Sequence, residues 1–107
     1  MGTSYKDVVS ALTDAIQNLS QAYGIATDAD DKDRIFSMME MLQDEVNAVS
    51  SAGLAVSDSV YQAQTDSFRN SADQLNQFKA KIDQYINNVA LISSVADSLT
   101  KIIGLLA

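Results

Sequence analysis

The chain has 107 residues and a net charge of −7 at neutral pH, from 14 acidic and 7 basic side chains, and it contains no His, Cys, Pro or Trp. This length suits a single domain, and the acidic charge opposes binding to nucleic acid and to anionic membrane surfaces. Without His or Cys the usual general base, thiolate nucleophile and soft metal ligands are missing, so we expect no enzyme, no cofactor and no metal site.

Composition favours an all-α fold. Hydrophobic residues make up 47% of the chain, and the lack of Pro permits long uninterrupted helices. Twelve of the acidic residues are Asp, which forms helices less readily than Glu. We therefore expect helicity to come from the packing of apolar stripes, within one chain or between two.

The first predicted helix covers about residues 4–26. Its apolar side chains recur at spacings of three and four, which places them on one face of a helix: Tyr5, Val8, Val9, Leu12, Ile16, Leu19, Tyr23 and Ala26. The Asp-rich run 27–33 follows. It lacks the Gly and the final Glu of a calcium-binding loop, because those positions hold Asp33 and Met39. The run is interpreted as a polar turn whose Asp side chains cap the next helix.

The second predicted helix covers about residues 30–66. Its stripe alternates spacings of four and three, like a heptad repeat: Ile35, Met39, Leu42, Val46, Val49, Gly53, Val56, Val60 and Ala63. Because this stripe passes through Gly53 in phase, a continuous helix is favoured. The alternative is a helix end at Gly53, with Leu54 packing back on Val49.

The stripe changes phase after Ala63, and we place a turn within residues 66–71, where Ser71 and Gln74 have the spacing of a capping box. A stutter in one continuous helix would explain the same change. The third predicted helix covers about residues 71–106, and its apolar face is wider than a coiled-coil seam requires. The prediction is one domain, residues 1–107, with three helices in an antiparallel bundle, two of them long, in coiled-coil-like packing.

Three helices of unequal length would leave part of the third helix's wide apolar face uncovered, and uncovered apolar faces usually mark interfaces. We therefore expect a non-enzymatic protein–protein interaction module that binds a second copy or another helical protein. The Met-rich run 36–41 could add an adaptable binding surface or widen the core. The candidate interface residues are Phe36, Met38, Met41, Phe78, Tyr85, Ile92, Val95, Ile102 and Leu105.

Two other functions fit the same pattern. A membrane-active or secreted amphipathic helical protein is one, although Asp97 and Lys101 interrupt the apolar tail and make it a poor spanning segment. The other is an adaptor, chaperone or immunity-type partner that neutralises a basic protein by charge complementarity. No signal-peptide or transmembrane pattern occurs in this chain, so we expect a soluble protein, and the sequence does not indicate its compartment.

Overall fold

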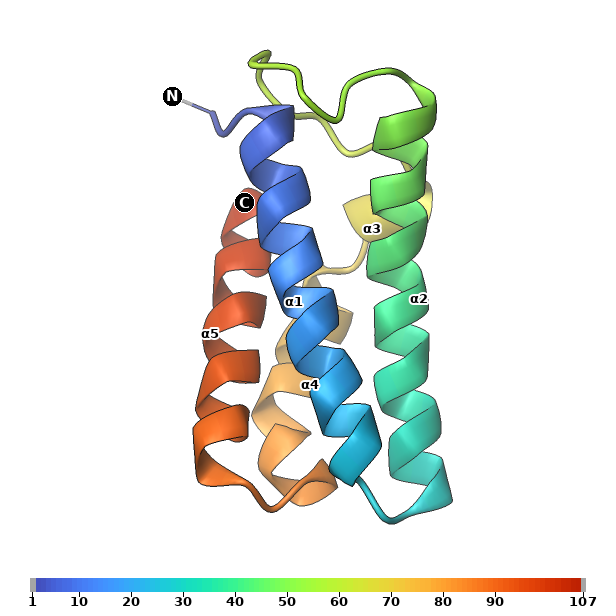
Figure 1. Ribbon diagram of the computed structural model, residues 1–107, viewed down its shortest axis with the longest axis vertical. Coiled ribbons are helices and arrows are strands. Elements are labelled where there is room, and N and C mark those ends of the chain that lie inside the picture. Colours follow the sequence, from blue (N-terminus) through green and yellow to red (C-terminus); the bar gives the residue numbers. More distant parts are fainter. Residues whose placement is uncertain (1, 107) are drawn as a thin grey trace.

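The computed structural model describes residues 2–106, and it is all-helical, as the sequence predicts. The described chain has five helices where the sequence analysis predicts three: α1 Tyr5–Ile25, α2 Ala29–Ser51, α3 Asp66–Arg69, α4 Ala72–Tyr85 and α5 Val89–Leu105. The four longer helices run alternately down and up as an antiparallel bundle, and the short α3 lies beside the upper half of α2 (Figure 1). The loop of residues 52–65 crosses the upper end, next to the N-terminal segment.

The first two helices begin within one residue of the predicted positions, and a side chain caps each of them. The Ser4 hydroxyl accepts a hydrogen bond from the Asp7 N–H at 3.2 Å, and the Asp28 carboxylate accepts the N–H groups of Asp30 and Asp31 at 2.9 and 3.1 Å. Each bond satisfies a donor that the first turn of a helix leaves free. The interpretation of the Asp-rich run as a helix cap is therefore confirmed.

The prediction of a continuous second helix to residue 66 is wrong, because α2 ends at Ser51. Gly53 has a φ of 74°, a left-handed conformation that Gly adopts without strain. The Leu54 N–H then donates to the Val49 carbonyl at 3.0 Å, which is the bond that defines a Schellman helix end. The alternative helix end at Gly53 is the correct one.

The apolar spacing beyond Gly53 was misleading. Val56 and Val60 continue the heptad-like stripe, yet they are 82% and 62% exposed. They lie in the irregular loop, so their spacing no longer places them on a helix face. The stripe identified apolar residues correctly but could not identify which of them are buried.

The third predicted helix, 71–106, is also wrong as a single element, because α4 ends at Tyr85 and α5 begins at Val89. Asn88 caps the new helix, and its side chain accepts the Leu91 N–H at 2.9 Å. The break lets α5 fold back against α4, and each half buries its apolar face against the other and against neighbouring helices.

The predicted turn before this region is present, but its capping box is not. The chain turns at Asn70 between α3 and α4, inside the predicted range 66–71. Ser71 makes no side-chain cap bond, and its hydroxyl instead donates to the Phe68 carbonyl at 2.6 Å. Ser71 therefore holds the C-terminal end of α3 and not the first turn of α4.

The core fills the space between the four longer helices. α1 packs against both α2 and α5, and α4 packs against α5. Four small, buried side chains allow this close approach from two sides. Three belong to α1 and the fourth follows its last residue: Ala11, Ala15, Ala22 and Ala26. The largest fully buried apolar side chains are Phe68, Leu12, Leu19, Ile35, Leu42, Leu75, Leu99 and Ile102.

The inward face of α2 is turned slightly from the predicted one. The predicted stripe runs through Met39 and Val46, which are only partly buried. The fully inward positions instead hold Met38, at 3% exposure, and Glu45, at 0%. A charged residue thus occupies a core position of α2, directly before a valine that could have taken its place.

Candidate functional site

Most of the nine candidate interface residues belong to the chain's own core. Five are buried: Met38, Met41, Phe78, Val95 and Ile102. Three are partly buried against the core: Tyr85, Ile92 and Leu105. Phe36 alone among the nine is exposed, at 48%. The premise of an uncovered face on the C-terminal helix is therefore wrong for this fold, because the break after Tyr85 lets that face pack inside one chain.

The structure also separates Phe36 from the other residues of the Met-rich run. Phe36 lies at the lower end of the bundle, where its ring is tilted against that of Tyr23 with the centroids 6.1 Å apart. The Lys32 amine lies 4.4 Å from the centre of the Tyr23 ring and donates to the Tyr23 carbonyl at 2.5 Å. Met38 and Met41 face the core instead, so this run widens the core and does not form one surface.

A buried carboxylate in the upper half of the molecule holds a loop to α2. Glu45 is fully buried, and four donors surround it. Its Oε1 accepts the N–H and the hydroxyl of Thr65 at 2.9 and 2.8 Å. Its Oε2 accepts the Tyr61 hydroxyl at 2.5 Å and the Gln64 N–H at 2.8 Å. All four donors come from the loop of residues 52–65, so Glu45 attaches this loop to α2.

Aromatic packing and backbone pairing reinforce this attachment. The Tyr61 ring meets the rings of Tyr5 and Phe68 edge-on, with centroids 5.4 and 6.4 Å away. The Tyr61 N–H donates to the Thr3 carbonyl at 2.8 Å, and the Tyr5 N–H donates to the Ser59 carbonyl at 3.0 Å. The loop is therefore held to α2, to α1 and to the N-terminal segment at once.

Sequence reasoning missed Glu45 and Tyr61. A signal for Glu45 was present, because it lies three residues after Leu42 and four before Val49, both core residues. Its burial depends on donors supplied by a loop about twenty residues later in the chain. No local pattern identifies those donors, because two of them are backbone N–H groups, which every residue except Pro carries.

Burial raises the pKa of Tyr61 well above its ordinary value of 10.0, and the hydrogen bond to Glu45 and the charge of that carboxylate raise it further. Above pH 10 the unfolded chain releases the Tyr61 proton while the folded chain keeps it, so the free energy of unfolding falls as the pH rises. We expect this alkaline loss to be smaller in Tyr61→Phe. Urea unfolding between neutral pH and about pH 11 measures the difference, and equal slopes for both proteins would contradict it.

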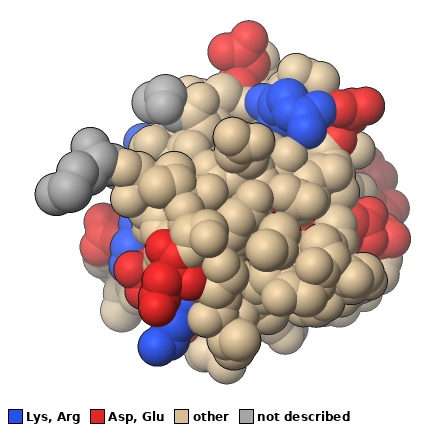
Figure 2. All heavy atoms as spheres, turned by 90° about the horizontal axis from the view of Figure 1, so that it is seen from above, with Lys and Arg blue, Asp and Glu red and all other residues tan. Residues whose placement is uncertain are grey.

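The loop forms an end face that carries almost no charge. Between Val46 and Thr65 the only charged residue is Asp58. Figure 2 looks down on this end and shows an uncharged centre with charged side chains at the margin. Val56 and Val60 are the strongly exposed large apolar residues of this loop. In a chain of net charge −7, this face therefore carries few charges, and its most exposed large side chains are apolar.

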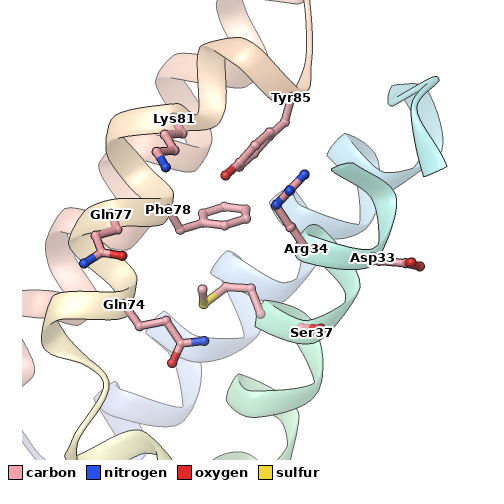
Figure 3. A pocket seen from close by; sticks show the side chains of 9 residues that line it. Asp33, Arg34, Ser37, Gln74, Gln77, Phe78, Lys81 and Tyr85 are labelled. Atoms are coloured by element: carbon pink, nitrogen blue, oxygen red, sulfur yellow. The ribbon is translucent and has the colours of Figure 1, made fainter. Parts of the chain in front are cut away.

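A groove lies on the opposite half of the bundle, between α2 and α4. It has a volume of about 370 Å³, and its lining residues are Asp33, Arg34, Ser37, Met38, Gln74, Gln77, Phe78, Lys81 and Tyr85. Figure 3 shows Phe78 and Tyr85 reaching from α4 toward Arg34 of α2. Three candidate interface residues, Met38, Phe78 and Tyr85, are thus brought together around this groove.

Within residues 2–106, no group of three or more His, Cys, Asp and Glu side chains is arranged to hold a metal ion. No helix in the same range is long and apolar enough to cross a membrane. Comparison with protein-family models, with curated proteins and with solved structures finds no match to this chain.

Proposed function

We propose that this protein is a non-enzymatic interaction module whose partner is a second copy of the same chain, bound through the loop end. The observation that carries the proposal is the end face, where Asp58 is the only charged residue of the loop and Val56 and Val60 are exposed at 82% and 62%. The apolar face of α5 is used inside the chain, so the association surface that we propose differs from the one inferred from the sequence.

Electrostatics support a second copy at this end. Two copies of net charge −7 repel each other, and the repulsion is weakest where the facing surfaces carry few charges, as at this loop, which holds only Asp58. A two-fold contact would place the same weakly charged patch of each copy against the other. The bonds of Glu45 keep the loop in one conformation, which lowers the entropy that association would otherwise cost.

The helix packing is compatible with such a module. The buried positions 35, 38, 42, 45 and 49 of α2 alternate spacings of three and four, which supports coiled-coil-like packing inside each copy. The membrane-active alternative has less support, because the apolar residues of α5 that would enter a bilayer pack in the core. The lack of His and Cys supports a non-enzymatic role.

Sedimentation equilibrium tests the proposal with a matched pair of variants. For the wild type we expect a mass that rises from 11.5 kDa toward twice that value with concentration. Val56→Asp combined with Val60→Asp should weaken association by about tenfold or more, because it places like charges in an apolar contact. Val89→Asp is the control, since Val89 is 83% exposed and lies at the other end of a bundle about 40 Å long.

Salt gives a second readout. Because the net charges of the two copies oppose association, added salt should screen them and strengthen the wild-type dimer. A wild type that stays monomeric at every concentration, or a control variant that weakens association as much as the double variant, would overturn the proposal. Thermal unfolding of each variant shows whether a lost dimer reflects the surface change or a lost fold.

A further inference from the structure

The α2–α4 side of the bundle is packed differently from its other sides. The backbones of α1 and α2, of α1 and α5, and of α4 and α5 come into close contact, whereas α2 and α4 approach each other less closely. In the upper half α3 packs against α2 on this side (Figure 1), and the groove described above is lined by residues of α2 and α4. Its volume of about 370 Å³ falls within the range of small-molecule sites.

The groove has an apolar floor. Phe78 is 5% exposed and Met38 is 3% exposed, and both line the groove. The Tyr85 ring packs against that of Phe78 at a tilt of 48°, with the centroids 5.3 Å apart. These side chains offer a flat aromatic surface and a polarisable thioether, which suit the contacts of a compact ring or short hydrocarbon.

Two positively charged side chains, one from each helix, border this floor. Arg34 of α2 lies with its guanidinium 5.8 Å from the Tyr85 ring centroid and pairs with Asp31 at 3.1 Å. Lys81 of α4 makes no ion pair within the described residues. In Figure 3 the Tyr85 hydroxyl lies between the Lys81 amine and the Arg34 guanidinium, while the carboxylate of Asp33 points away from the groove.

We propose that this groove binds a small organic carboxylate with an aromatic or short aliphatic body. The body would lie on Phe78 and Met38, and the carboxylate would accept hydrogen bonds from Lys81, Arg34 and the Tyr85 hydroxyl. The overall charge of −7 opposes the binding of an anion, so binding depends on these local donors. The site is separate from the loop end, and its occupation does not require a second copy.

Titration with 2-naphthoate, followed by amide chemical shifts, tests the proposal. We expect saturable shifts at the groove residues of α2 and α4, and no comparable shifts with uncharged 2-naphthamide. Lys81→Gln should weaken naphthoate binding by about tenfold, because it removes a charge-assisted hydrogen bond. Lys79→Gln is the matched control on the same helix, since the Lys79 amine bonds Thr100 of α5 at 3.1 Å, outside the groove.

Three results would overturn the proposal. The first is that the amide signals of the groove residues do not shift when naphthoate is added up to millimolar concentrations. The second is equal binding of naphthamide, which would show that the positive groups play no part. The third is equal weakening by the Lys79 and Lys81 variants, which would indicate a general charge effect. Lys81 is exposed, so its replacement leaves the fold intact for this comparison.

Discussion

Replacing Glu45 by Gln is expected to lower the free energy of unfolding by about 3 kcal/mol, although the two side chains have nearly the same shape. Each oxygen of the Glu45 carboxylate accepts two hydrogen bonds, one of them from a backbone N–H. In Gln, one of these oxygens becomes an NH₂ group, which cannot accept. At least one backbone N–H of Gln64 or Thr65 would then face another donor in a buried place.

Glu40, the only other Glu in the chain, supplies a matched control. Glu40 lies on the same helix and is exposed, so Glu40→Gln should change the free energy of unfolding by no more than about 0.5 kcal/mol. Urea unfolding at neutral pH measures both variants. Equal midpoints for the two variants would contradict a structural role of the Glu45 carboxylate.

The Glu45→Gln variant also tests whether the loop of residues 52–65 depends on its hydrogen bonds to Glu45. Weaker bonds to residues 61–65 should free the loop before the bundle unfolds, because the main core is built from the helices. Hydrogen exchange should therefore accelerate at Gln64 and Thr65 first. If the loop end is the dimer surface, self-association should weaken in the same variant.

Replacing Ile102 by Ala is expected to lower the free energy of unfolding by about 2–5 kcal/mol. Ile102 is fully buried, although the sequence analysis places it at an interface. Truncating a core residue destabilises each chain, whether or not it is associated with another. The difference in the free energy of unfolding between variant and wild type should therefore not change with protein concentration. An interface residue would instead show a difference that grows with protein concentration, because only the associated chains make the contact that the truncation removes.

Ile103→Ala is the control for this experiment. Ile103 is the next residue of α5 and has the same side chain, but it is only partly buried against the core. Its truncation should cost clearly less, because less apolar surface returns to water. Urea unfolding at two protein concentrations about a hundredfold apart separates the two explanations. A concentration-dependent effect at Ile102 would restore the α5 face as an interface.

The candidate interface residues show what apolar spacing predicts and what it does not. Sequence patterns found the residues that are buried, such as Phe78, Val95 and Ile102, but assigned them to contacts between chains. That assignment depended on the helices being long and continuous. Once α4 and α5 are separate helices, the same residues can face one another inside one chain. Spacing within a helix gives the apolar face, and the connections between helices decide what covers it.

The sequence by itself determined the all-helical class and the approximate starts of the first two helices, because capping and apolar periodicity are local properties. Only the tertiary structure decided that α2 ends at Ser51 and does not continue to residue 66, and that Glu45, rather than Val46, faces the interior. The burial of Glu45 depends on a loop that returns to α2 and supplies hydrogen-bond donors to its carboxylate. Such long-range pairing leaves no periodic trace in the sequence, since its energy comes from groups that meet only in the folded chain.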